Sequence, residues 1–460
     1  MVILDVSVVN VALPSIRNSL QFSEQDLQWV VNAYTVTFAG FLLLGGRAAD
    51  LIGRRRVFVF GLTLFALASL AGGLADSKVL LIAARAVQGL GGAIVAPASL
   101  SILTTTFAEG PARNRAVGIW GAMGGAGGAA GVLLGGVLTD LLSWRWILFI
   151  NVPIGLMAAI LAERYIVAGR AARSERNFDL AGAVSATLGL SLLVLGIVRT
   201  DVTGWGSIPT LALMVAGIVL LAAFVVIEGR FAKAPLMPLR IYASRTLRAS
   251  NVVVFTLGAS TFAMWFFLSL YLQQVLGYSP LRAGLAFLPM TLSLVVASTL
   301  VSKGVTRVGA KPVLVAGMAL LALGLVLFTQ LSPGGTYLGD ILVPSLLAAI
   351  GMGMAFVPVV IAAVSGVAPH EAGLASGLVN TSRLFGGALG LAILAAIATA
   401  HTNSDLRHGV AMHAALTNGF VTAFAIAAAF AAVGAMAAAI GLPQVSLRAS
   451  RRQAIAAEGA

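Results

Sequence analysis

The sequence predicts an all-α polytopic membrane protein that crosses the bilayer about fourteen times and consists of two related halves. Of its 460 residues, 59% are hydrophobic and only 10% are charged, which is too apolar for a soluble domain. Apolar runs of about 20 residues, the length that spans a bilayer as a helix, recur along the whole chain. A short charged segment at 45–56 follows the second apolar run, and a weaker copy follows at 302–311, as in a membrane protein built from parallel repeats.

The apolar runs predict spans near 1–17, 28–44, 57–75, 79–103, 116–139, 146–168, 179–198, 208–227, 250–275, 283–302, 313–331, 339–362, 376–400 and 414–442. They predict four regions: a six-helix bundle over 1–168, cytoplasmic loops with an inserted helix pair over 169–248, a second six-helix bundle over 249–442 and a tail over 443–460. A helix from Met1 to Pro14 rises only about 21 Å, short of the ~30 Å hydrocarbon core. We therefore expect the first span to be truncated, with Met1 an internal methionine of a longer chain.

Positive charge sets the expected orientation, because Lys and Arg are retained on the cytoplasmic side. With 45–56 inside, most of the 29 Lys and Arg residues fall in inner loops or at inner span ends, Arg383 among them, and both termini are cytoplasmic. Topology and anionic lipid in the cell (cytoplasmic) membrane account for the net charge of +13, so nucleic acid is not an expected partner. The absence of cysteine excludes disulfides and thiol chemistry.

Two predicted spans carry ionisable side chains. Asp5 lies with Asn10 in the first span, and Arg85 lies three residues before Gln88 in the fourth, on the same helical face. Charges at membrane depth are costly and usually functional. Since the spans contain no other securely buried acid, we expect Asp5 and Arg85 to share a polar cavity and to handle a proton. The alternatives are that Asp5 lies near the water interface and that Arg85 snorkels or packs structurally.

The fifth span is rich in glycine. Its small residues recur every four positions, a pattern that lets helix backbones approach closely and predicts a tight, sliding contact between the halves. The glycines of this pattern are Gly121, Gly125, Gly128, Gly131, Gly135 and Gly136.

Aromatic and amide side chains in the ninth and thirteenth spans are candidates for a central ligand cavity, where a large amphipathic molecule would bind between the halves. The alternative is plain packing or anchoring at the interface. The candidates in these two spans are Trp265, Tyr271, Gln273, Gln274 and Asn380, and Asn10 of the first span and Gln88 of the fourth join them.

The sequence lacks the motifs typical of ATP-driven transport, of serine hydrolases and of metal sites. No lysine precedes Ser or Thr, so there is no P-loop, and no GxSxG sequence supplies a nucleophile. His401, His408 and His413 share one outer loop, but their spacing suits no standard metal site. We therefore expect neither an enzyme nor a bound metal or cofactor, and a proton gradient as the energy source.

Four motifs together resemble a known family. Residues 45–56 resemble the major facilitator superfamily signature GxLaDrxGrkxxl, matching at Gly46, Asp50, Gly53, Arg54 and Arg55. Residues 85–92 are similar to the family's fourth-helix motif, while 4–14 and 144–153 are similar to the first and sixth helices of the fourteen-span drug:proton antiporters, the QacA/EmrB-like group. The chain departs from that group by lacking the proline of the fifth-helix motif GPxxGG at 131–136, and the tenth span carries no acid.

The resemblance implies a major facilitator fold and a proton-coupled antiporter that exports hydrophobic or cationic small molecules, such as drugs and antibiotics, by alternating access. It implies that Gly46, Asp50, Gly53, Arg54 and Arg55 form a cytoplasmic latch, and that Asp5 and Arg85 couple the proton. The expected partners are a small-molecule substrate, protons and the lipid bilayer, with the protein a monomer. A major facilitator importer or symporter of a small organic solute is the alternative, and a membrane sensor without flux is a second.

Overall fold

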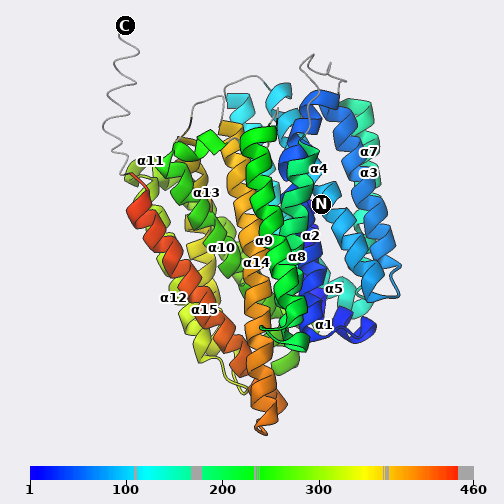
Figure 1. The fold of residues 1–460 in the computed structure, drawn as a ribbon, viewed down its shortest axis with the longest axis vertical. Coiled ribbons are helices and arrows are strands. Elements are labelled where there is room, and N and C mark those ends of the chain that lie inside the picture. The colour runs from blue at the N-terminus through cyan, green and yellow to red at the C-terminus, as the bar shows by residue number, and fades with distance from the viewer. Residues whose placement is uncertain are drawn as a thin grey trace.

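The computed structural model describes residues 1–107, 111–166, 179–232, 235, 237, 239–365, 367 and 372–443, and within these ranges it is helical with no strand. Long helices run side by side through the molecule (Figure 1). The α-helices are α1 Val2–Leu20, α2 Glu24–Ile52, α3 Arg54–Gly73, α4 Lys78–Thr106, α5 Pro111–Leu141, α6 Trp146–Phe149, α7 Asn151–Tyr165, α8 Leu180–Thr203, α9 Ile208–Val226, α10 Arg245–Leu270, α11 Pro280–Val308, α12 Ala310–Leu327, α13 Leu342–Ser365, α14 Ala372–Arg407 and α15 Met412–Gly441. Short π and 3₁₀ turns extend or join them: η1 Ile227–Phe231, η2 Leu239–Ala243, η3 Tyr271–Val275, η4 Phe328–Gln330 and η5 Tyr337–Ile341.

Eleven helices of the described chain are long and apolar enough to cross a membrane, so the prediction of an all-α polytopic membrane protein is confirmed. The predicted number of fourteen spans is not confirmed. The other three predicted spans, 1–17, 28–44 and 116–139, correspond to helices α1, α2 and α5, which are not among the eleven. Asp5 and Asn10 lower the hydropathy of α1, and the apolar stretch of α5 in the described part of the chain, Gly127–Leu141, is too short to cross a membrane.

The two repeated charged segments have the same backbone break. Gly53, between α2 and α3, has φ 112°, and Gly309, between α11 and α12, has φ 94°. Side chains other than glycine rarely adopt these angles, so a glycine is required where each helix ends and the next begins.

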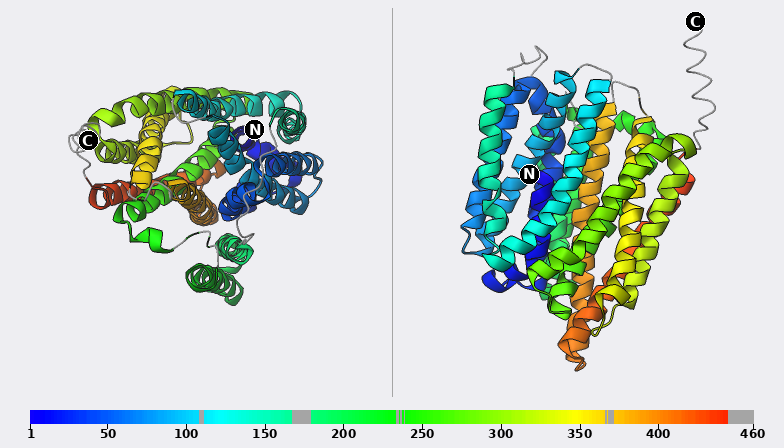
Figure 2. Two further views of the ribbon diagram at one scale, coloured as in Figure 1. Left: turned by 90° about the horizontal axis from the view of Figure 1, so that it is seen from above. Right: turned by 180° about the vertical axis from the view of Figure 1, so that it is seen from behind.

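The helix pair α8 and α9 lies at the edge of the bundle (Figure 2). The two helices touch closely, because a Cβ on Gly217 would lie 2.8 Å from the carbonyl oxygen of Gly189. Val194 of α8 packs with Val36 of α2 and Ala388 of α14, whereas α9 buries only Thr210 and Gly217. The pair therefore packs on the outer side of α2 and α14 and does not line the centre of the bundle.

Helices α1, α2, α5, α10, α11 and α14 form the contacts between the first and last thirds of the chain: α5 packs on α11, α2 on α14, and α1 on α10. The connections α1–α2, α5–α6 and α10–α11 lie at one end of the bundle, the lower end in Figure 1. We call it the α1–α2 end.

Candidate functional site

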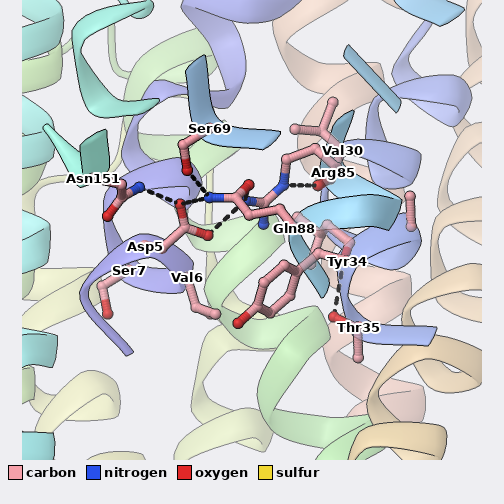
Figure 3. A network of polar contacts seen from close by, with 12 residues as sticks. Asp5, Val6, Ser7, Val30, Tyr34, Thr35, Ser69, Arg85, Gln88 and Asn151 are labelled. Atoms are coloured by element: carbon pink, nitrogen blue, oxygen red, sulfur yellow. Dashed lines mark hydrogen bonds and ion pairs between the residues drawn. The ribbon is translucent and has the colours of Figure 1, made fainter. Parts of the chain in front are cut away.

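Asp5 of α1 and Arg85 of α4 form an ion pair in the bundle interior (Figure 3). Arg85 Nη1 lies 2.5 Å from Asp5 Oδ2, and the side chains are 2% and 0% exposed. Burying two charges is costly unless each finds its opposite and further hydrogen bonds. Both conditions are met here.

Three polar side chains complete the carboxylate's surroundings. Gln88 Nε2 and Asn151 Nδ2 both donate to Asp5 Oδ1, at 2.7 and 2.8 Å. Gln88 also accepts from Arg85 Nη1 at 2.5 Å and donates to Ser69 Oγ at 2.7 Å. The carboxylate on α1 is thus hydrogen-bonded by side chains of α4 and α7, and Ser69 of α3 joins the network through Gln88.

Arg85 is also held by contacts that do not involve Asp5. Its Nε donates to the carbonyl oxygen of Val30 at 3.0 Å, and its guanidinium carbon lies 4.5 Å from the ring centroid of Tyr34. A cation over an aromatic face is stabilised, more so when desolvated. The guanidinium can therefore keep its place if the carboxylate becomes neutral.

The glycine-rich face of α5 makes close contacts with α1 of the same half and with α11 of the other half, while the sliding contact expected between the halves stays a prediction. A Cβ on Gly131 would lie 2.7 Å from the carbonyl oxygen of Leu4, and one on Gly135 would lie 2.9 Å from that of Val8, so α5 supports the helix that carries Asp5. Gly136 approaches Pro280 and Leu281 of α11 in the same way. Gly128 has looser surroundings, and those of Gly121 and Gly125 lie outside the described part of the structure.

The segment predicted as a cytoplasmic latch joins α2 to α3. Arg55 Nη1 donates to the carbonyl oxygens of Glu163 and Ile166 at the end of α7, at 3.4 and 3.3 Å, where a cation also complements the helix dipole. Gly46 lies on α2, Gly53 ends it and Arg54 begins α3. Asp50 lies on the last turn of α2, and its side chain is outside the described residues.

The residues predicted to line a cavity are dispersed. Gln88 belongs to the Asp5 network. Gln273 Nε2 donates to the carbonyl oxygen of Val11 at 2.9 Å, and Ser269 Oγ donates to that of Asn10 at 2.6 Å, which ties α1 to α10 and η3.

The remaining cavity candidates have other surroundings. The Tyr271 ring is buried in the core, with its hydroxyl donating to the carbonyl oxygen of Ser332 at 2.6 Å. Trp265 packs on Phe287, at 5.1 Å between ring centroids. Both amide atoms of Gln274 are buried without a protein partner, and Asn380 accepts from Arg383 at 3.0 Å.

Two features were missed in the sequence. Gln25, Gln28 and Asn32 of α2 are buried, and each has at least one amide atom without a protein hydrogen-bond partner. Their i, i+3, i+7 spacing places them on one helical face and was available as a signal. Arg383, expected at the cytoplasmic end of its span, instead lies about 17 Å along α14 from Ala372, because the helix begins earlier than expected.

Comparison with known proteins agrees with the fold and the motifs. The sequence model of the Major Facilitator Superfamily matches residues 1–391. The cephamycin export protein CmcT of Amycolatopsis lactamdurans is 48% identical over 407 residues, 88% of this chain and 84% of that protein. The puromycin resistance protein pur8 of Streptomyces alboniger is 39% identical over 434 residues, 94% of this chain and 86% of that protein.

Solved structures share the fold at low identity. A bacterial homolog of the human lysosomal transporter Spinster, in an inward-facing and unoccupied conformation, superimposes with a TM-score of 0.66 at 16% identity, covering 97% of this chain and 96% of that one. The family match and the relatives named as export and resistance proteins exclude an enzyme. The chain is a multi-pass membrane transporter that belongs to the Major Facilitator Superfamily.

Proposed function

We propose that this protein is a proton-coupled antiporter that exports hydrophobic or cationic small molecules, antibiotics among them, across the cytoplasmic membrane by alternating access. The observation that carries the proposal is the Asp5 carboxylate, fully buried and bonded to Arg85, Gln88 and Asn151. A single ionisable carboxyl at this depth, with a cation beside it, is a proton site that conformational change can open and close.

The chemistry follows from the contacts. Protonation of Asp5 removes its charge and weakens the ion pair, while Arg85 keeps its bonds to Val30 and its contact with Tyr34. Helix α1 is then held to α4 less strongly. Since α1 also contacts α10 through Asn10 and Ser269, the proton on Asp5 changes the contact between the two halves.

Alternating access requires one end of the bundle to open. The α1–α2 end, which we assign to the outer side, is closed by α5 on α11 and by α1 on α10. Gln25, Gln28 and Asn32 are buried near this end with unpartnered amide atoms, which is unfavourable without water. Opening would let water reach these amides, which favours the open state.

The direction of transport is proposed from the relatives. Those at 48% and 39% identity are named for cephamycin export and puromycin resistance. The motifs of the first and sixth predicted spans support the fourteen-span antiporter group, with two six-helix bundles and the inserted pair α8 and α9. One proton moving through about 100 mV releases ~2.3 kcal/mol, which supports a gradient of roughly fifty-fold. The proposal includes a monomer with cytoplasmic termini, no cofactor, and a latch at 46–55.

The test uses everted membrane vesicles with an acidic lumen, and follows the pH gradient by dye fluorescence as compounds are added. We expect puromycin or lipophilic cations to release protons from vesicles with the native chain and not from those with Asp5→Asn. The control is Asp76→Asn, which neutralises an exposed carboxyl in the connection between α3 and α4. Compound-dependent proton release that survives Asp5→Asn contradicts the proposal, and compound uptake with protons favours the symporter.

A further inference from the structure

Arg383 is a second arginine inside the helical bundle, and within the described ranges no carboxylate lies at ion-pair distance from it. It is part of a candidate membrane span on α14 and is partly buried. An arginine at this depth is costly, and such residues almost always face a partner or a cavity. Arg85 differs in this respect, because its Nη1 lies 2.5 Å from the Asp5 carboxylate.

Hydrogen bonds to other described residues use only a small part of the donor capacity of Arg383. A guanidinium carries five N–H donors, and here Nη2 donates to Asn380 Oδ1 at 3.0 Å, one turn earlier on the same helix. Arg383 is only partly buried, so part of its surface is not covered by the protein.

Aromatic rings surround the guanidinium. Its carbon lies 5.9 Å from the ring centroid of Phe262 on α10 and 5.5 Å from that of Phe356 on α13. Phe262 in turn packs in a cluster with Tyr34 and Phe38 of α2 and Leu384 of α14. The cation is thus bordered by apolar ring surface that extends towards Tyr34, on which Arg85 stacks.

The helices that carry these groups are fixed in place. Ser382, next to Arg383, donates to Asn251 Oδ1 of α10 at 2.6 Å. The backbone of α14 approaches α10 so closely that a Cβ on Gly258 would collide with the carbonyl group of Arg383. The guanidinium therefore starts from a defined backbone position, and a ligand need not first order the helices.

We propose that Arg383 binds the carboxylate of an amphipathic aromatic substrate, an organic anion or zwitterion whose apolar body lies against Phe262 and Phe356. A guanidinium pairs with a carboxylate through two parallel hydrogen bonds, and more donors than that are open. A singly charged carboxylate neutralises the one arginine, whereas a phosphate dianion would leave net charge buried at additional cost. The inference rests on the proposed export function and adds carboxylates to the hydrophobic and cationic compounds.

The test measures binding to the purified full chain in lipid nanodiscs by calorimetry. The probes are a cephamycin, which bears a ring carboxylate, and the methyl ester made at that carboxylate. We expect the native chain to bind the acid more tightly than the ester by about tenfold or more, as for one charge-assisted pair. In Arg383→Gln the two affinities should become equal within about twofold, and Arg383→Lys should retain part of the preference.

A matched control is Arg282→Gln. Arg282 also lies over an aromatic ring, 3.9 Å from the Tyr278 centroid, but it is exposed at the beginning of α11. Its replacement should leave the preference for the acid unchanged. Monodisperse elution of each variant shows that it is folded, and Arg383→Lys reports on the site if Arg383→Gln does not elute as native protein.

Three results overturn the inference: no binding of the acid, equal binding of acid and ester by the native chain, or an unchanged preference once Arg383 is replaced by Gln or Lys. Failure of the proposed export function is seen separately, with puromycin, which has an amine and no carboxylate. Proton release by puromycin that depends on Asp5, without binding of the acid, leaves antiport intact and rejects the anion site. Binding of the acid that depends on Arg383, without proton movement for any compound, rejects antiport alone.

Discussion

The carboxylate of Asp5 and the guanidinium of Arg85 lie 2.5 Å apart in the bundle interior, although 80 residues separate them in the sequence. Both side chains are almost completely buried. Removal of one partner from such a pair leaves the other charge buried and uncompensated, whereas removal of both does not. The pair is therefore both a proposed proton site and a contact on which the packing of α1 depends.

The ion pair should show strong coupling in a double-mutant cycle. We expect Asp5→Asn and Arg85→Gln each to destabilise the protein by about 3 kcal/mol or more, because each strands a buried charge. The double variant should lose less than the sum of the two. Thermal unfolding in detergent measures this, and additive losses would show that the two side chains do not depend on each other.

A methyl group added to the α5 face that packs on α1 should destabilise the protein at Gly131 but not at Gly128. Gly131→Ala places a Cβ 2.7 Å from the Leu4 carbonyl oxygen, which forces the helices apart, and we expect a loss of about 1–3 kcal/mol. Gly128→Ala is the control, since its nearest contact is 3.8 Å, from Ser7 Oγ. Equal thermal midpoints for the two variants would contradict this account of the glycine pattern.

Opening of the α1–α2 end should expose Gln28. The chain has no cysteine, so Gln28→Cys provides a single thiol at a fully buried position. We expect slow labelling by a membrane-impermeant maleimide added outside, and faster labelling when Gln273→Ala removes the hydrogen bond from α10 and η3 to Val11. Ser19→Cys, exposed on α1, should label rapidly in both backgrounds. Unchanged labelling at position 28 would show that this contact does not help to keep the end closed.

The glycine between α2 and α3 should not accept a side chain. Gly53 has φ 112°, so we expect Gly53→Ala to cost about 1–3 kcal/mol in backbone strain. Gly46→Ala, within helix α2, should be neutral or slightly stabilising, because its nearest contact would be 3.5 Å, from Pro97 Cβ. Comparison of thermal midpoints checks both, and a stable Gly53→Ala protein would refute the requirement for this angle.

Much of the site could be anticipated from local patterns. Arg85 and Gln88 were expected on one face because residues three apart on a helix lie on the same side, and their side chains do touch, at 2.5 Å. Asp5 was expected beside Arg85 because the spans contained no other securely buried acid. By contrast, Asn151 and Ser69 come from helices whose place around α1 no local pattern specifies, and neither was anticipated.

The sequence by itself determined that the chain is helical and embedded in a membrane, which residues are too polar to face lipid, and which glycines allow close helix contacts. These properties follow from hydropathy and from the period of the residues along a helix, both of which act over short stretches of chain. Only the tertiary structure decided that side chains of α4 and α7 surround the charge of Asp5, while Arg383 has aromatic rings and no carboxylate nearby among the described residues. The electrostatic surroundings of a buried charge depend on which helices pack together, and that is a property of the whole bundle.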